Sequence, residues 1–598
     1  MPGQSVPPTP AEPAAPRRRR APRAARAVPG VLLLLVLAWA AAVAVSGVQA
    51  ARALQRVADA APGLAEQVRA ERFEEARTRA RAVADDAAAA RRATSQWPYR
   101  AAEHVPWVGA QLRAASAGAA AAAALTEPLP GALGVASDVL AEGLVSADRT
   151  VDVEGVQRLA PVVVDYRDRV EAARSALAAA EDPAVVGALS RRLEPVSRQL
   201  REVAGPLGTA AELVPRLPGL LGAEGARTYV VAFTNPAEVR PVQGIVGAYA
   251  YVSVDGGSIR LTGTGTDAEF GPARGDSAVN GAEYAGLYGG DRDAGRVQNL
   301  TVGAQADDAA RLTASLFADA GKPVPDAVVL VDPVGLAQLL GAEHAPLDLG
   351  VFGTVATADL PRVLMEDAYV RFAQDNDARK AFLASASAAA FEAVLSDGVS
   401  TSALRGGREA AASGHLAVWS SREQEQRALE AAGLAGVLGG PRAAAHVGLT
   451  NVAPSKLDYW TRPQLRLQRP CATGSAQAVA ELELTLTNPV PEEVPAYVQN
   501  QVATTAAGRR TARDVVSLWV PPAVGLDGAS VDGRAVPTSV DAERGWRLVR
   551  LTVQLPPGEP VVVRWRLRGP ARALPAEVTG PTTVSAPEVV VAPCSDAL

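Results

Sequence analysis

Few residues of the chain are of the kinds that mark metal sites or nucleic-acid contacts. Its 598 residues include two cysteines and four histidines, and the net charge is −5 at pH 7. Two cysteines are too few for a thiolate zinc site, and nucleic-acid binding usually needs a basic excess. The net negative charge therefore leads us to expect no nucleic-acid partner. The length exceeds what one hydrophobic core can support, so we expect several domains.

Motifs of the common catalytic classes are also missing. No Walker loop, HExxH or G-x-S-x-G segment occurs, and GTGTDA lacks the third glycine of a dinucleotide fingerprint. His344, His415 and His446 are isolated in the sequence, which indicates packed or surface histidines rather than general bases. No residue is therefore assigned to catalysis, and carboxylates and arginines remain as the candidates for binding.

The two cysteines, Cys471 and Cys594, both lie near the C-terminus. A pair of this kind in an exported domain is typical of a disulfide, and two free buried thiols are the alternative. Closing so long a loop stabilises a fold by roughly 4–5 kcal/mol in the chain-entropy model.

One uncharged run, Val28–Val48, is long enough to cross a membrane. As a helix it rises about 31 Å, which matches the hydrocarbon thickness of a bilayer. We predict a single-pass helix over residues 28–50, with a disordered cytoplasmic tail at 1–27 and an extracytoplasmic body in the cell envelope. A cleaved signal peptide is the alternative, because Val48-Gln49-Ala50 resembles a cleavage site. The arginines that set this orientation are Arg17, Arg18, Arg19, Arg20, Arg23 and Arg26.

Residues 51–225 are predicted to form a helical stalk. Strong helix formers dominate 51–125, and Pro98 and Gly109 interrupt them, which predicts a helix–turn–helix. A second helical block follows at about 131–204. Antiparallel helices of this kind, with coiled-coil packing, indicate a spacer or a surface for homo-oligomerisation.

From residue 226 to 463 the pattern changes to alternating strands and helices. The apolar runs Tyr229–Phe233 and Ile245–Val254 predict buried strands. Pro325–Val331 predicts another strand, followed by a helix that Asp332 caps. This alternation predicts a central α/β sheet domain with flanking helices. Further strands are expected at His415–Trp419 and His446–Val452, and further helices at about 357–396 and 420–432.

The polar segment between the first two strands is the best candidate for a site, because open sheets bind ligands beyond strand ends. Glu238 and Arg240 are two residues apart, so on an extended segment they project to one side. They either hold a phosphate or a metal, or pair with each other. Magnesium is the cation we consider, with Asp291 and Asp293 as further ligands or as a solvated loop. The candidate ligand-binding residues are Asn235, Glu238, Arg240, Gln243, Asp267, Asp276, Lys456 and Asp458.

Residues 464–571 alternate apolar and polar side chains. Leu482, Leu484 and Leu486 face one way, and Val561–Leu567 repeats the pattern. We predict an antiparallel β-sandwich, followed by a tail at 572–598. The fold class is therefore multidomain α/β plus all-β, behind an N-terminal transmembrane helix and an α-helical stalk.

Four segments carry a family resemblance in the right order. They resemble the bacterial family called domain of unknown function 4012, which implies a membrane-anchored envelope protein, over most of residues 50–570. Family members usually have two glycines where this chain has Gln243-Gly244 and phenylalanine where it has Ile245. The segments are RTYVVAFTNPAEVRPVQGIVGAYAYVSVDGG, DAVVLVDPVGLAQLLGA, GHLAVWSS and VGLTNVAPSKLDYW.

At the level of the fold, the anchor, the exported sheet and the element Val328–Gly341 also resemble the LytR–CpsA–Psr glycopolymer transferases. That resemblance implies arginines for a polyprenyl pyrophosphate and acidic residues for magnesium. Asn235, Glu238 and Arg240 match the first polar cluster of that family by their order along the chain. Its Pro-Arg-Asp turn is missing, and only Asp267 stands in its place, which weakens the grip on pyrophosphate.

Two functions follow from these features. The first is an envelope protein that binds or scaffolds a cell-surface glycopolymer without catalysis. The second is a magnesium-dependent LytR–CpsA–Psr-like transferase or hydrolase of polyprenyl-pyrophosphate-linked glycans. We favour the first because the Pro-Arg-Asp turn and an obvious base are missing. A groove lined jointly by Arg240, Asp267 and Asp276 is the feature that favours the second.

Overall fold

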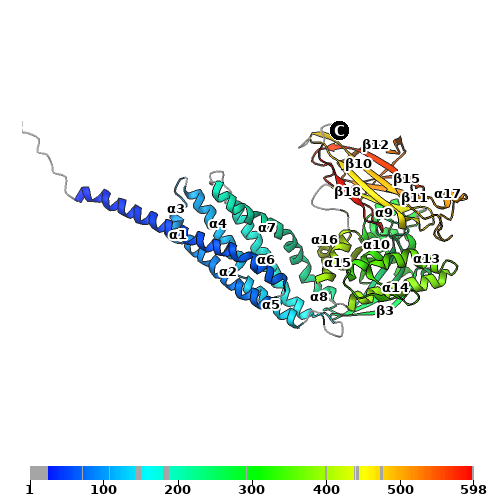
Figure 1. Ribbon diagram of the computed structural model, residues 1–598, viewed down its shortest axis with the longest axis horizontal. Coiled ribbons are helices and arrows are strands. Elements are labelled where there is room, and N and C mark those ends of the chain that lie inside the picture. The colour runs from blue at the N-terminus through cyan, green and yellow to red at the C-terminus, as the bar shows by residue number, and fades with distance from the viewer. Residues whose placement is uncertain are drawn as a thin grey trace, which may run out of the picture. The chain divides into compact units, whose positions relative to one another are not determined.

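A computed structural model describes residues 24–594, and contacts divide the chain into two compact units (Figure 1). The first unit consists of Met1–Ser137 and Tyr166–Gly205, and the second of Asp138–Asp165 and Pro206–Leu598. Most of the predicted tail at 1–27 and Asp291 lie outside the described residues. Within 24–594 the description omits 71, 107, 143–144, 146–149, 180–186, 291–292, 397–400, 437, 439–443 and 472–475.

The N-terminal part of the chain is helical, as its composition predicts. Small alanine side chains allow close contact between these helices, and Ala80, Ala87 and Ala119 are fully buried. Arg56 on α1 bonds Asp86 on α2 at 2.6 Å, which fixes the antiparallel pairing of these two helices. The helices are α1 (Ala24–Arg69), α2 (Phe73–Thr94), α3 (Trp97–Ala102), α4 (Val108–Thr126), α5 (Leu129–Glu142), α6 (Val153–Ala179) and α7 (Gly187–Leu213).

Two described stretches are long and apolar enough to cross a membrane by length and composition, Leu33–Val68 and Val108–Val139. The first is near the N-terminus and is compatible with the predicted anchor. The second has a third of its apolar window buried, and its alanines Ala119, Ala121 and Ala123 are almost fully enclosed. The second stretch therefore has a packing explanation within its own unit.

A five-stranded sheet with the order β3-β2-β1-β4-β7 forms the centre of the second unit. Strands β1 and β4 are parallel, and the other pairs are antiparallel. Both strands are apolar along their length because helices cover both faces. Val230 packs on one side with the helix α10, and Val231 packs on the other with α11 and α14.

Helices surround this sheet, as Figure 1 shows. The strands are β1 (Arg227–Asn235), β2 (Ile245–Asp255), β3 (Ser258–Thr266), β4 (Ala327–Val331) and β7 (Leu416–Ser420). The covering helices are α9 (Gly281–Tyr288), α10 (Ala306–Asp319), α11 (Pro333–Leu340), α12 (Leu360–Arg362), α13 (Ala368–Arg371), α14 (Asn376–Ser396), α15 (Thr401–Ala412) and α16 (Glu423–Ala431).

The cap expected at Asp332 is present. Its Oδ1 accepts a hydrogen bond from the Gly335 amide at 2.9 Å, which satisfies a free donor at the start of α11. Its Oδ2 lies 2.5 Å from Nδ1 of His415, which precedes β7. Gly335 has no room for a side chain, because a Cβ there would lie 2.3 Å from the His415 carbonyl oxygen. The carboxylate therefore joins a helix start to a neighbouring strand.

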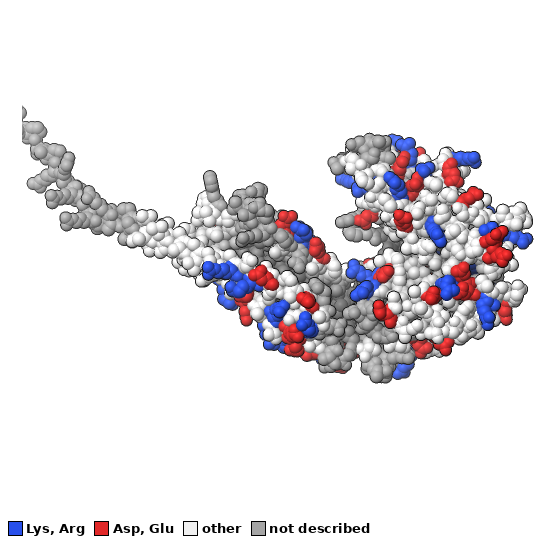
Figure 2. All heavy atoms as spheres, viewed as in Figure 1, with Lys and Arg blue, Asp and Glu red and all other residues white. Residues whose placement is uncertain are grey.

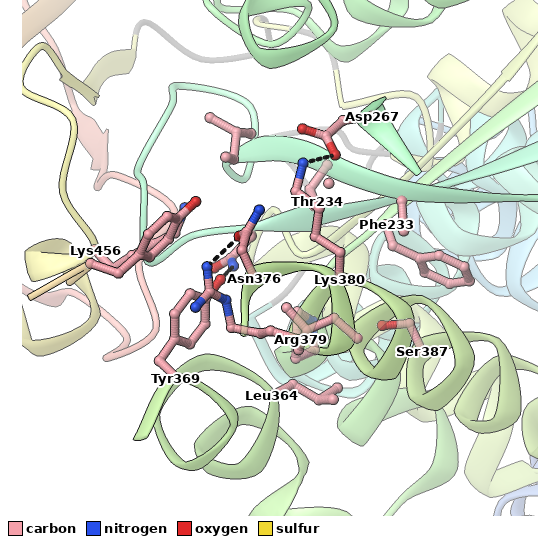
Figure 3. Close-up of a pocket in the computed structure, with 17 residues that line it drawn as sticks. Phe233, Thr234, Asp267, Leu364, Tyr369, Asn376, Arg379, Lys380, Ser387 and Lys456 are labelled. Atoms are coloured by element: carbon pink, nitrogen blue, oxygen red, sulfur yellow. Dashed lines mark hydrogen bonds and ion pairs between the residues drawn. The ribbon is translucent and has the colours of Figure 1, made fainter. Parts of the chain in front are cut away.

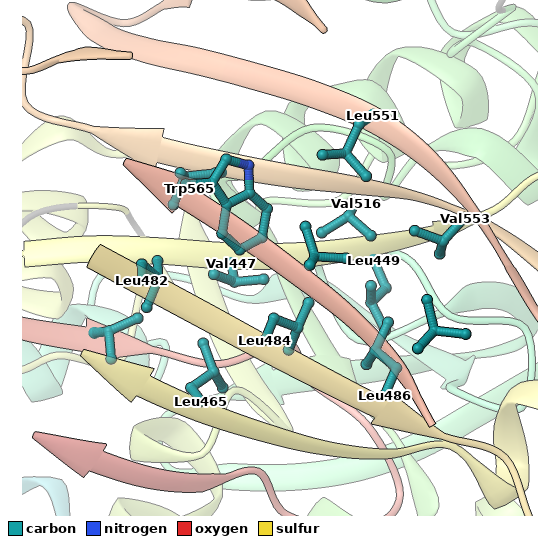
Figure 4. Packing of buried hydrophobic residues seen from close by; sticks show 14 of the residues in the cluster. Val447, Leu449, Leu465, Leu482, Leu484, Leu486, Val516, Leu551, Val553 and Trp565 are labelled. Carbon is teal, nitrogen blue, oxygen red and sulfur yellow. The ribbon is translucent and has the colours of Figure 1, made fainter. Parts of the chain in front are cut away.

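Two further sheets pack face to face in the C-terminal part. Their inner side chains form one core, in which Leu482, Leu484 and Trp565 of the first sheet meet Leu449 and Val516 of the second (Figure 4). The orders are β13-β12-β16-β10-β9-β18 and β14-β15-β11-β8-β17. The strands are β8 (Ala444–Asn451), β9 (Arg462–Gln468), β10 (Gln477–Thr487), β11 (Ala512–Val520), β12 (Gly525–Val531), β13 (Arg534–Ala535), β14 (Ser539–Glu543), β15 (Trp546–Leu555), β16 (Val561–Pro570), β17 (Glu577–Thr579) and β18 (Glu588–Val591).

Two features differ from the sequence prediction. Strand β8 was assigned to the central domain, but it pairs with β11 and its alternate side chains Ala445, Val447 and Leu449 enter the C-terminal core. The predicted tail contains β17 and β18, which pair in parallel with β8 and β9. Cys471 and Cys594 follow the paired ends of β9 and β18, and they are bonded with their Cα atoms 4.8 Å apart.

A buried ion pair at the start of β1 gives the first prediction. Arg227 Nη1 lies 2.7 Å from Glu425 Oε2, and the two side chains are 2% and 6% exposed. Replacing Glu425 by alanine leaves the guanidinium buried without a counter-charge, so we expect a loss of about 3–5 kcal/mol in unfolding free energy. Denaturant unfolding followed by circular dichroism measures it.

The matched control is Glu423→Ala on the same helix, where the side chain is 80% exposed and pairs with Arg427. A surface pair of this kind contributes at most about 1 kcal/mol. Equal losses in the two variants would contradict the importance of the buried pair.

Candidate functional site

A cavity of about 90 Å³ opens at the C-terminal ends of β1 and β4. Sheets that contain parallel strands bind ligands at this edge, because loops and helix starts converge there. Its wall comes from the ends of β1 to β3, from α13 and α14, and from two C-terminal loops. The lining residues are Phe233, Thr234, Asn235, Ile245, Gly247, Ala248, Asp267, Pro333, Leu364, Tyr369, Asn376, Arg379, Lys380, Leu383, Ser387, Lys456 and Tyr497.

Arg379, in the first turn of α14, is the most enclosed cation of the cavity. Its side chain is 2% exposed. Nη2 donates to Asn376 Oδ1 at 2.6 Å, and Nη1 donates to the Phe372 carbonyl at 3.4 Å. No carboxylate among the described residues pairs with it. The cavity wall contains two further cations, Lys380 and Lys456. The helix start adds to the positive potential at this point.

Two aromatic rings contact the same guanidinium, and Figure 3 shows it beside Tyr369. The Arg379 Cζ lies 3.9 Å from the ring centre of Tyr497 and 4.9 Å from that of Tyr369. The two rings are near-parallel, 6.1 Å apart. Asn235 Nδ2 donates to the Tyr369 hydroxyl at 2.9 Å, which fixes this ring, and burial raises the Tyr369 pKa above its usual value. The rings thus hold the guanidinium in one orientation.

The two lysines of the cavity have acidic partners. Lys380 Nζ lies 2.8 Å from Asp267 Oδ1, and this pair is drawn in Figure 3. Lys456 pairs with Glu238. Burial lowers the pKa of Lys456 to about 7, while the nearby carboxylate of Asp458 acts in the opposite direction. Each lysine therefore has a carboxylate partner, whereas Arg379 has none among the described residues.

Arg240 belongs to a buried network beside the cavity and not to its wall. Nη1 donates to the carbonyl oxygens of Val239 and Asn451, each at 3.0 Å. Asp458 Oδ2 accepts hydrogen bonds from Asn451 Nδ2 at 2.6 Å and from the Val239 amide at 3.1 Å. Burial lowers the pKa of Arg240 to about 10. This network ties the segment after β1 to β8.

A second carboxylate, Asp514, completes the network. It is fully buried on β11, opposite Asn451 in the strand register. Burial and the charge of Asp458 raise its pKa well above the usual value, and the guanidinium of Arg240 opposes that rise. The Arg240 charge is thus the counter-charge for two carboxylates, which is a structural role.

The predicted site residues separate into three groups. Asn235, Asp267 and Lys456 line the cavity, and Glu238 reaches it through its pair with Lys456. The proposed Glu238–Arg240 pair does not form, because each has another partner. Arg240 and Asp458 lie in the network, and the remaining two, Gln243 and Asp276, are elsewhere.

Gln243 and Asp276 have local structural roles. Gln243 is fully buried with φ at 62°, a conformation that favours glycine. Its Oε1 accepts from Thr234 Oγ1 at 2.7 Å and its Nε2 donates to the Leu330 carbonyl at 3.2 Å. Asp276 accepts from the Ala278 amide at the start of a short helix. Arg240, Asp267 and Asp276 therefore do not line one groove.

Sequence reasoning missed Arg379, Lys380, Tyr369 and Tyr497. No local signal marked them, because the start of α14 at Asn376 was not predicted and Asp377 gives its first turn an ordinary acidic residue.

Metal binding has less support in the geometry. Within the described part of the chain, no three His, Cys, Asp or Glu side chains form a group that could hold an ion, so the magnesium hypothesis stays a prediction. Asp293 pairs instead with Arg274 and Arg296.

Residues 224–369 match the family model described as "Protein of unknown function (DUF4012)". This match supports the resemblance to that family within residues 224–369. Comparison with curated proteins and with solved structures finds no match, and the resemblance to the LytR–CpsA–Psr transferases is not shown. The DUF4012 match includes Asn235, Asp267 and Tyr369 of the cavity. Arg379, Lys380, Lys456 and Tyr497 come from the chain after it.

The structural role of Arg240 gives the second prediction. Its removal in Arg240→Ala leaves Asp514 without the cation beside it and Asp458 with Lys456 alone, so we expect about 3–5 kcal/mol lower unfolding free energy. Denaturant unfolding measures the change. The control is Arg260→Ala on β3, where the side chain is exposed and an effect within about 0.5 kcal/mol is expected. A stable Arg240→Ala protein would return this arginine to the list of ligand-binding candidates.

Proposed function

We propose that the protein is a membrane-anchored binding protein of the cell envelope, and that its cavity holds one phosphate or carboxylate group of a cell-surface glycan. The observation that carries this proposal is the enclosed Arg379 guanidinium, which has no carboxylate partner among the described residues. Three features support it: the charge of Arg379, the size of the cavity, and the N-terminal helix together with the disulfide.

The first feature is that most N–H donors of the charged Arg379 side chain have no described acceptor. A guanidinium has five N–H donors, and this one has two hydrogen bonds to described acceptors, neither of them charged. Burying a charge without a counter-ion is costly. A phosphate or carboxylate would supply the charge and would suit the planar fork of the side chain. The stacking rings keep that fork in place for such a ligand.

The second feature is the small volume of the cavity, which limits the size of the group that can bind there. A volume of about 90 Å³ is well below the roughly 300–1,000 Å³ of pockets that enclose a whole drug-sized ligand. The cavity therefore suits one anionic group of a larger molecule. Tyr497 is 42% exposed, so its outer part offers an amphipathic surface for the attached sugar.

The third feature is the combination of the N-terminal helix and the disulfide, which bears on where the protein is located. The apolar stretch at the start of α1 suits a membrane anchor, and the arginines before it favour a cytoplasmic N-terminus. A disulfide between Cys471 and Cys594 fits an oxidising compartment outside the cytoplasm. Anionic glycans are abundant ligands with the required charge in that setting. A transferase has less support, because its proposed residues Arg240 and Asp276 are committed elsewhere.

The third prediction tests Arg379 directly. Isothermal titration of the full chain in detergent, with glucose 1-phosphate, glucuronate, inorganic phosphate and glucose, is expected to show binding of anions and none of glucose. In Arg379→Gln we expect about tenfold or greater loss of affinity, since a charged hydrogen bond contributes about 1.5–3 kcal/mol. Arg379→Lys keeps the charge but loses the fork, so an intermediate affinity is expected.

The control is Arg371→Gln, which removes an exposed arginine from the end of α13 and should leave the affinity unchanged. Circular dichroism checks that each variant is folded. Equal binding of glucose and glucose 1-phosphate, or unchanged affinity in folded Arg379→Gln, would overturn the proposal. The ratio between glucose 1-phosphate and glucuronate identifies the preferred anion.

A further inference from the structure

The turn between α2 and α4 packs against the apolar part of α1. We call residues 95–106 and 108 the hairpin tip. Trp39 Nε1 on α1 donates to the Pro98 carbonyl at 2.9 Å, and Ser46 Oγ donates to Gln96 Oε1 at 3.4 Å. The Tyr99 ring lies 4.0 Å from the Cβ position of Gly47. The tip is therefore level with residues 39–47 of α1.

The length of α1 places that level within a membrane. No charged residue occurs between Arg26 and Arg52. The twelve residues from 27 to 38 precede the first contact with the tip and rise only about 18 Å. A bilayer has a hydrocarbon core of about 30 Å, which needs about twenty helical residues. Counted from Ala27, such a span ends near Ser46, so it overlaps the tip by several residues.

The exposed surface of the tip suits this position. Trp97 is 76% exposed and Val108 is 51% exposed, and exposure of this degree is unusual for a tryptophan in water. Arg100 and His104 are exposed beside them. Tryptophan beside a cation such as Arg100 is typical of the boundary between headgroups and acyl chains. On α1, the exposed run that starts at Leu33 is free of charged side chains, as Figure 2 shows for its described part.

We propose that the hairpin tip enters the boundary between headgroups and acyl chains in the leaflet on the C-terminal side of α1. This inference rests on the membrane anchor of the proposed function. The occupant of the apolar tip surface is lipid, because that surface continues the apolar surface of the anchor at the same level. A second point of attachment then restricts how the α1–α2–α4 hairpin tilts against the bilayer.

Spin labels test the position in the full chain reconstituted in liposomes. Cys471 and Cys594 are bonded to each other, so one introduced cysteine is the only free thiol. The tip variants are Trp97→Cys and Val108→Cys, and the second retains the tryptophan. Thr78→Cys is the control on α2, exposed and about 24 Å along the helix from its end at the tip. Leu35→Cys reports on the anchor itself.

Collisions with a water-soluble nickel chelate and with oxygen give the depth of each label. We expect the tip labels and the Leu35 label to lose nickel accessibility and gain oxygen accessibility, and Thr78 to remain accessible to nickel. Tip labels as accessible to nickel as Thr78, with Leu35 protected, would overturn this inference alone. An aqueous Leu35 label would overturn the anchor. Tip protection from both reagents, with dipolar broadening between labels, would assign the tip to a contact between two copies and overturn the lipid contact.

Discussion

The cavity depends on one constraint, which is that the charges buried after β1 must be satisfied by residues far away in the sequence. Arg240 reaches the Asn451 carbonyl, and Asp458 bonds both Asn451 and the Val239 amide. These bonds hold the β1–β2 connection against β8 and the segment that follows it. Because Lys456 precedes Asp458 by two residues, the same bonds bring Lys456 to the cavity, and the Lys456 amide bonds the Val498 carbonyl beside Tyr497. The network thus positions the ring that covers Arg379.

A second joint holds the two C-terminal sheets to the central sheet domain. Arg544, in the turn between β14 and β15, bonds Asp307 at 2.9 Å at the start of α10 and also pairs with Asp308. Burial and the charge of Asp307 raise the pKa of Asp308 to about 6, and the guanidinium of Arg544 opposes that rise. Next to it, Glu543 accepts hydrogen bonds from Trp519 and Tyr288. Buried polar contacts therefore help to fix the register between these parts.

The sequence predicts those elements whose signals are local. Alternation of apolar residues predicted β10 and β16, and the Asp-Pro start predicted the cap of α11, because both depend on neighbours within a few residues. The sheet to which β8 belongs was not predictable, since either core accepts its apolar side chains. The helix expected over 357–396 is interrupted before Asn376, and no strong breaker marks that point. The cavity around Arg379 was missed for the same reason: the Tyr497 ring and the Lys456 amine reach it only through tertiary contacts.

Gln243 shows how a local exception becomes understandable only in the structure. The family resemblance leads one to expect glycine there, and the positive φ explains why glycine is favoured. This chain accepts the strain of a larger residue, and its amide forms hydrogen bonds to Thr234 and Leu330 that glycine cannot form. Those bonds connect the end of β1 to β4, the two parallel strands whose ends form the floor of the cavity. The departure from the family pattern therefore adds a side-chain link between the ends of these two strands, next to the cavity residue Thr234.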